Sequence, residues 1–320
     1  MSAAMLLILT HSADATADYL CLSLQKAEIA FLRINSDAVI GKIRLFSRDG
    51  STRLIIGSRT IVAGDISNVW LRRPRTLSTE LAADPAERRN LILEWSEALE
   101  GFLAQIPLEK WINHPSANVG ASHKLEQLHR ASQFGLNIPK TLMTQDSADL
   151  LNFWKECQGQ VIVKPLASGF LERTASDEDS HIYTNAVKLE HLDGQALVNC
   201  PTLFQATIDK TLDVRVTVLD GEIEAVSMKA VESDGIQRLD IRRNNMSDVA
   251  YGQITVPSKI KDILIPYLNS YKLRFAAVDM AVDRKGEWIF FEVNPNGQWA
   301  WLDLVGVADI GGMFIRRLRT

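Results

Sequence analysis

The stretch FFEVNPNGQW, residues 290–299, places a carboxylate and two amides at the end of an apolar strand. Phe290 and Val293 are typical of a buried strand, yet Glu292 and Asn294 occupy alternate positions within it. Side chains two residues apart in a strand point to the same face. Solvated polar residues on an edge strand are the simpler explanation. We favour a metal site, because a buried charge needs a partner or a metal ion.

A second strand supplies a further carboxylate. The segment FAAVDMAV, residues 275–282, carries Asp279 and is joined to the first stretch by DRKGEW, which is typical of a hairpin turn. The two strands are therefore expected to be antiparallel neighbours, with Asp279 facing Glu292 and Asn294 across the ladder. Hard oxygen ligands of this kind suit Mg²⁺, which takes few protein ligands and leaves the others to phosphates and water.

Two lysines could act beside such a metal. Lys164 follows the apolar residues VIV, and Lys124 opens a predicted helix. Each lysine by itself is more often a surface residue with a buried stem. Together they could hold a triphosphate, with the loop around Gly169 supplying backbone N–H groups. The chain contains no GxxxxGK[ST] motif, so this would not be a P-loop.

Arginines provide further candidates. Arg215 lies in LDVRVTVL, where it is either a salt-bridged structural residue or a group that neutralises a transferring phosphoryl. Arg242 and Arg243, in LDIRRNN, could likewise neutralise a transferring phosphoryl group, or they could lie in a solvated loop. Arg72 and Arg73, in WLRRP, could face substrate carboxylates, but an exposed strand end is equally plausible.

Composition excludes several classes of protein. The chain has 320 residues, a net charge of −4 and a pI of about 5.9, which disfavours a protein that coats nucleic acid. Its three cysteines form neither a metal-ligand pattern nor a disulfide framework, as expected in a reducing cytoplasm. No apolar run approaches the roughly 20 residues that span a bilayer. No nucleophile–base set stands out.

The order of expected elements divides the chain into three units, 1–112, 113–200 and 201–320. The first reads as strand, helix and strand, with a hairpin at Asp49-Gly50. The second mixes helices and short strands, and in it Ser122 is the expected N-cap and Gly135 the expected stop of one helix. The third is rich in antiparallel strands. The predicted fold class is α/β and α+β.

The ordered set of these motifs resembles the ATP-grasp superfamily. It comprises Lys124 on a helix, VIVKP with its glycine loop, FQATI, DVRV, and the pair of strands that bear Asp279 and Glu292. Within the superfamily, WLRRP and EVNPNGQWAWL look like the ligases that macrocyclise microviridins and other graspetide peptides. The resemblance covers the whole chain and implies an N-terminal Rossmann-like pre-ATP-grasp domain, a central domain and a C-terminal antiparallel-sheet domain.

The resemblance also implies roles for individual residues. These are phosphate contacts from Lys124 and Lys164; an adenine pocket from Gln205, Ala206, Thr207 and Ile208; Mg²⁺ ligands Asp279, Glu292 and Asn294; and acyl-phosphate contacts from Arg215 and Arg242. In such ligases an Asp or Glu side chain of a precursor peptide reacts with ATP and is then captured by a Ser, Thr or Lys side chain. A leader segment of the peptide docks on the central domain, and the enzymes are typically homodimers.

Two other functions are compatible with the same residues. One is a ligase that adds glutamate or another amino acid to a protein or a small acid. The other is a non-catalytic nucleotide-binding regulator, which would have no need of the complete set of metal ligands. In the mechanism that the resemblance implies, Pro295 and Gly297 turn the chain away after Asn294 and leave room for the metal.

Overall fold

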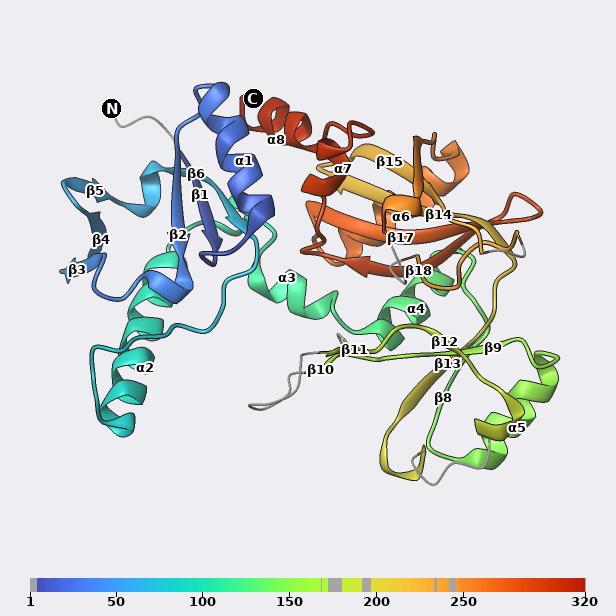
Figure 1. Cartoon of the computed structure of the whole chain (residues 1–320). Coiled ribbons are helices and arrows are strands. Elements are labelled where there is room, and N and C mark those ends of the chain that lie inside the picture. The colour runs from blue at the N-terminus through green and yellow to red at the C-terminus, as the bar shows by residue number, and fades with distance from the viewer. Residues whose placement is uncertain are drawn as a thin grey trace.

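The computed structural model describes residues 5–167, 169–171, 180–191, 197–232, 235–241 and 246–319. Three parts follow one another along the chain (Figure 1). The blue N-terminal part lies on the left, the green and yellow central part at the lower right, and the orange and red C-terminal part at the upper right. The expected order of α/β, α+β and antiparallel-rich units is confirmed. No helix in the described ranges has the length and apolar character needed to cross a membrane.

The N-terminal part is built on a parallel sheet with the strand order β2-β1-β6-β7. All six residues of β1 are buried, because a central parallel strand is covered on both faces. A small antiparallel sheet follows β2, and its first turn has positive φ angles at Asp49 and Gly50, as the hairpin prediction required. The elements are β1 (Met5–Thr10), α1 (Ala15–Lys26), β2 (Phe31–Asn35), β3 (Arg44–Arg48), β4 (Ser51–Ile56), β5 (Arg59–Ile61), β6 (Ile66–Leu71), α2 (Pro85–Leu103) and β7 (Trp111–Ile112).

The central part has a four-stranded antiparallel sheet with the order β12-β9-β13-β8. Its elements are α3 (Pro115–Gly120), α4 (Lys124–Gln133), β8 (Thr141–Thr144), α5 (Ser147–Glu156), β9 (Val161–Lys164), β10 (Phe170–Leu171), β11 (Ser180–His181), β12 (Asn185–Ala186) and β13 (Thr202–Ala206). Gly135 ends the α4 segment with a φ of 89°, as expected. The prediction for Ser122 is wrong. His123 is the N-cap residue, since the Ser122 hydroxyl donates to the carbonyl of Asn118 instead.

The C-terminal part is a five-stranded antiparallel sheet with the order β16-β15-β14-β17-β18. The predicted hairpin between β17 and β18 is confirmed. Helix α6 forms although it contains Pro266. The elements are β14 (Lys210–Leu219), β15 (Glu222–Lys229), β16 (Ala250–Gln253), α6 (Ser258–Ser270), β17 (Phe275–Asp283), β18 (Trp288–Asn294), α7 (Ala300–Leu304) and α8 (Ile310–Arg319).

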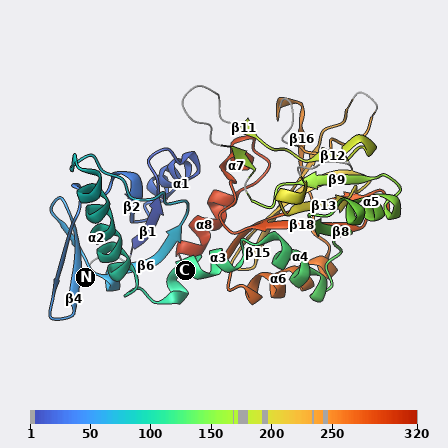
Figure 2. The same cartoon turned by 90° about the horizontal axis from the view of Figure 1, so that it is seen from below.

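A shared apolar core joins the N-terminal and C-terminal parts. Helix α8 packs between α1 and β14, and Figure 2 shows it between the two sheets. Trp299 is fully buried there and stacks on Phe314 with ring centres 5.6 Å apart, while Trp70 of β6 lies 5.1 Å from the same phenyl ring. Large aromatic surfaces buried across a boundary hold the two parts firmly together. The residues directly after β18, the strand that carries Glu292 and Asn294, are therefore anchored in this core.

Candidate nucleotide and metal site

The predicted polar residues of the C-terminal sheet lie side by side. Arg215 of β14 is the register partner of Asp279 of β17, and Asp279 is the register partner of Glu292 of β18. Arg215 Nε donates to Asp279 Oδ1 at 2.7 Å. Asn294 Nδ2 donates to Asp279 Oδ2 at 3.0 Å and approaches Glu292 Oε1 at 3.5 Å. Three neighbouring strands thus present one row of two carboxylates, an amide and a guanidinium.

A β-bulge in β18 makes this row possible. Asp279 pairs with Glu292 and Met280 pairs with Phe290, so Phe291 is the extra residue. Strict alternation would have placed Phe290 on the same face as Glu292. The bulge reverses the alternation, because an extra residue re-aims the side chains that follow it. Phe290 therefore stays in the core with 0% exposure, and Glu292 still faces the polar row.

The two predicted lysines approach the row from the central part. Lys124, the first residue of α4, has its Nζ 3.5 Å from Glu292 Oε2 and donates to the Pro165 carbonyl at 2.8 Å. Lys164, the last residue of β9, has its Nζ 4.4 Å from the centre of the Phe291 ring. Both ammonium groups thus lie against the strand that carries Glu292. Three cations and two carboxylates share the site, which leaves a positive surplus suited to polyphosphate.

Burial and neighbouring charges shift the pKa values at this site. Burial lowers the pKa of Lys164 to about 8; the charge of Glu292 opposes this shift, while Lys210 and Lys124 add to it. Burial alone would raise the pKa of Glu292, but Lys124 and Lys164 outweigh it and hold that pKa below its ordinary value. Glu292 is therefore ionised at neutral pH, and Lys164 gives up its proton within an accessible pH range.

The side chains of the polar row could bind Mg²⁺ that is already coordinated by the phosphates of a nucleotide. No cluster of three or more His, Cys, Asp or Glu side chains occurs in the part of the chain that the structure describes. Asp279, Glu292 and Asn294 offer two carboxylates and one amide, and Mg²⁺ completes such a set with phosphate oxygens and water. Asn294 points its Nδ2 toward both carboxylates, so its oxygen would face a metal only after the amide rotates.

Comparison with known proteins identifies the fold that carries this arrangement. The family model described as the MvdD pre-ATP grasp domain matches residues 5–118. Macrocyclase MdnB from Microcystis aeruginosa MRC is 27% identical, with a TM-score of 0.75 over 98% of this chain and 99% of that one. The chain has the fold of the ATP-grasp ligases over nearly its whole length.

Two further solved structures share this ATP-grasp fold. Macrocyclase MdnC of the same organism, bound with precursor peptide MdnA, is 23% identical with a TM-score of 0.81 over 98% of both chains. A RiPP-associated ATP-grasp ligase of Chryseobacterium gregarium, in complex with ADP and a leader and core peptide, is 23% identical with the same TM-score over 98% of this chain and 96% of that one. No curated protein sequence matches the chain. The predicted ATP-grasp fold class is confirmed.

The segment expected to line an adenine pocket, residues 205–208, comprises the last two residues of β13 and the two residues that follow it. Gln205 is 2% exposed, and its Nε2 donates to Thr141 Oγ1 at 3.1 Å. The backbone N–H groups of Ala206 and Thr207 donate to Lys140 and Gln160 at 2.9 Å. These three donors are used inside the protein. The Ile208 carbonyl accepts from the Lys210 N–H at 2.9 Å. The prediction of a backbone-lined adenine pocket now concerns the N–H of Ile208 and the other carbonyl groups of the segment.

The glycine loop after β9 needs its glycine. Gly169 has a φ of 71°, and a Cβ at this position would lie 2.9 Å from the Ile182 carbonyl oxygen and 2.9 Å from Pro165 Cγ. Only glycine fits so close an approach. Arg242, the second predicted acyl-phosphate contact, lies outside the described residues, as does Arg243.

Sequence reasoning missed a buried network beside the lysines. Lys210 Nζ contacts both carboxylate oxygens of Asp213, at 2.6 and 2.8 Å, and Gln237 Nε2 donates to Asp213 Oδ2 at 2.9 Å. All three residues are less than a tenth exposed. The alternation of Asp213 and Arg215 was a usable signal, because it places both on the face that bears the site. The network fixes the start of β14, from which Arg215 projects.

A second missed network joins the loop after β18 to the N-terminal part. Arg72 is 1% exposed; its guanidinium donates to the Asn296 carbonyl and to Gln298 Oε1, and its Nε lies 3.5 Å from Asp14 Oδ2. Burial lowers the pKa of Arg72 to about 10, against the effect of Asp14, so the group stays charged at neutral pH. Arg72 therefore holds the loop and is not available to a substrate. The unusual WLRRP motif was the signal in the sequence.

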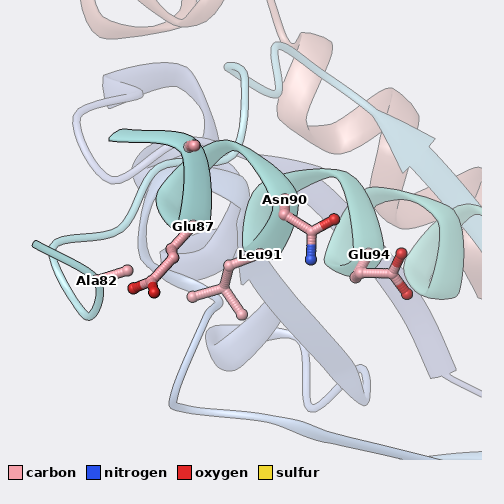
Figure 3. A pocket seen from close by; sticks show the side chains of 6 residues that line it. Ala82, Glu87, Asn90, Leu91 and Glu94 are labelled. Atoms are coloured by element: carbon pink, nitrogen blue, oxygen red, sulfur yellow. The ribbon is translucent and has the colours of Figure 1, made fainter. Parts of the chain in front are cut away.

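A hollow elsewhere in the molecule lacks these features. It has a volume of about 560 Å³ and lies along the first turns of α2 (Figure 3). Its lining consists of Ala82, Ala86, Glu87, Asn90, Leu91 and Glu94. Two carboxylates and no cation make it unsuited to a polyphosphate. The polar row therefore remains the candidate for the nucleotide site.

Proposed function

We propose that this chain is an ATP-dependent ligase that forms side-chain ester or amide crosslinks within a ribosomally made precursor peptide. The row of Arg215, Asp279, Glu292 and Asn294, faced by two lysines, carries the proposal. Such a row has no use in a purely structural sheet, since it places charges where burial is costly. The likeness to macrocyclase MdnB, at 27% identity over nearly the whole chain, supports a macrocyclase, and the likeness in fold to MdnC bound with precursor peptide MdnA supports a peptide as substrate.

The chemistry follows from the charges of the site. We propose that Lys124 and Lys164 hold the triphosphate and that Asp279, Glu292 and Asn294 hold Mg²⁺, which would neutralise charge on the phosphates. A substrate carboxylate oxygen then attacks the γ-phosphorus in line, ADP leaves, and an acyl phosphate forms. Arg215 stabilises the acyl phosphate. A hydroxyl or amine of the same peptide displaces phosphate and gives the ester or amide.

Positioning replaces a covalent enzyme nucleophile in this scheme. Two groups of one bound peptide react without a bimolecular encounter, which contributes several kcal/mol, on the order of 7 or more, to the lowering of a barrier. The chain therefore needs no nucleophile–base pair of its own. As further parts of the proposal, the adenine lies along residues 205–208, Arg242 assists Arg215, a leader segment docks on the central part, and the protein works as a homodimer in the cytoplasm.

The direct test is the intact mass of a peptide. A short peptide rich in Thr, Asp and Glu, encoded beside the gene, is incubated with the protein, ATP and Mg²⁺. We expect the loss of one water for each ring formed, together with ADP production, and neither when ATP is left out. A peptide that gains residue mass would identify an amino-acid-adding ligase. Nucleotide binding without any turnover would identify a regulator.

The pH dependence of nucleotide affinity tests Lys164. Its pKa in the folded protein, about 8, lies below its ordinary value, so the ammonium is lost as the pH rises through that range. Affinity for ADP should therefore fall between about pH 7.5 and 9.5, by up to about tenfold per unit above the pKa. Titration calorimetry at several pH values measures this. The Lys164→Met variant should bind ADP weakly and lose most of the pH dependence of its affinity. Lys188 is exposed, so the Lys188→Met variant should match the wild type.

A further inference from the structure

Three guanidinium groups surround the loop that follows β18. Arg72 donates to the Asn296 carbonyl and to Gln298 Oε1. Arg215 Nη1 donates to the Gln298 carbonyl at 3.3 Å from the side of the polar row. Arg73 Nε donates to the Asn296 carbonyl at 3.1 Å. The loop is thus a meeting point of the N-terminal part, which supplies two arginines, and the sheet that bears the site.

The three arginines differ in how their charge is balanced. Arg72 has Asp14, and Arg215 has Asp279 at 2.7 Å. In the part of the chain that the structure describes, no carboxylate lies within 4 Å of the Arg73 guanidinium. The Arg73 side chain is exposed, but partial desolvation by the surrounding protein and the nearby charge of Arg215 lower its pKa, while Asp14 opposes that change. An anion placed beside Arg73 would therefore relieve an unbalanced positive charge.

The geometry of Arg73 suits a carboxylate. Its Nε is fixed to a backbone carbonyl, which orients the planar group and leaves the N–H bonds of the two terminal nitrogens for a ligand. A guanidinium held in this way binds a carboxylate through two parallel hydrogen bonds. The neighbouring Pro74 restricts the backbone that presents it. A solvated side chain that merely tethers the loop is the alternative, and it predicts no preference for acidic ligands.

We propose that Arg73 is the specificity-determining residue that receives the acidic side chain of the peptide substrate. This inference rests on the proposed function. The nucleotide phosphates are assigned to Lys124 and Lys164, which approach Glu292 from the central part. Arg73 approaches from the N-terminal part and contacts the same loop as Arg215. The carboxylate would thus enter on the side of Arg215, where the acyl phosphate is to be stabilised.

The test compares Arg73→Gln with Arg75→Gln, an exposed arginine two residues further along the same segment. With the peptide of the mass experiment, Arg73→Gln should raise the KM for peptide about 10- to 100-fold, the effect of one lost charge-assisted contact. The KM for ATP should stay within about twofold of the wild-type value. Arg73→Lys, which keeps the charge without the fork, should recover part of the loss. Arg75→Gln should behave as the wild type.

A second measurement separates recognition from loop tethering. Kd values are measured for that peptide and for a version with Asn and Gln in place of its Asp and Glu residues. Wild type should prefer the acidic peptide and Arg73→Gln should not. The role of Arg73 would be overturned if Arg73→Gln weakened the binding of both peptides equally. It would also be overturned if the wild type formed rings and the KM of Arg73→Gln for the peptide were unchanged. Either result would leave the proposed function standing. A wild-type protein that leaves the peptide unbound and unchanged would overturn the proposed function and this inference together.

Discussion

Glu292→Gln is expected to lower ligase turnover by at least about 10³-fold, since a metal clamp on phosphates contributes several kcal/mol to the stabilisation of a transition state. The substitution keeps the volume of the side chain and removes its charge. Lys124 and Lys164 then lose the carboxylate that both of them face. Nucleotide affinity measured in EDTA should change only a few-fold, whereas the strengthening of that affinity by Mg²⁺ should disappear.

Glu287→Gln provides the matched control, because Glu287 lies in the exposed turn of the same hairpin. Its rate of ADP formation should equal that of the wild type. Rates of ADP formation and intact peptide masses are compared for the three proteins under the same conditions. If Glu292→Gln kept a tenth or more of the wild-type rate, Glu292 could not be a metal ligand.

Gly297→Ala is expected to be the second most damaging change. The loop after β18 lies so close to β17 that a Cβ on Gly297 would come within 2.3 Å of Ala277 Cβ, and 3.3 Å from Arg215 Nη1. Strand β17 is central in the sheet and cannot move aside, so the loop must shift. Overpacking of this kind costs about 1–3 kcal/mol of stability. Displacing Asn294 and Arg215 should lower activity by about 10²-fold, as small misplacements in catalytic sites do.

A compensating change makes this prediction specific. Ala277→Gly removes the atom with which the new Cβ collides, so the double variant should regain most of the lost activity. Gly101→Ala is the control, because a Cβ at that position in α2 meets nothing within 4 Å. It should leave activity unchanged and slightly raise the melting temperature. A Gly297→Ala variant with full activity would show that the loop does not position the site. Gly297 thus allows close packing against Ala277, and the expectation that it also leaves room for the metal stays a prediction.

The local patterns of the sequence determined much of the site. Glu292 and Asn294 share a face because alternation in a strand is a property of adjacent residues. The segment between Asp279 and Glu292 is too short for anything but a hairpin, which fixed their antiparallel pairing. The position of Lys164 at the end of an apolar strand likewise required no tertiary information. These features, together with their order along the chain, were enough to predict an ATP-grasp fold.

The sequence by itself thus determined which residues bear charge and along which strands they lie. Tertiary structure alone decided that Phe290 leaves the polar face, because a bulge depends on how two strands fit together. It also decided that Arg72 donates a hydrogen bond to Gln298, 226 residues away, while the adjacent Arg73 stays exposed. Two adjacent arginines look alike in a sequence. Their different fates arise because one side chain is buried against Asp14 and the other faces solvent, and burial is a property of the packed parts rather than of the local pattern.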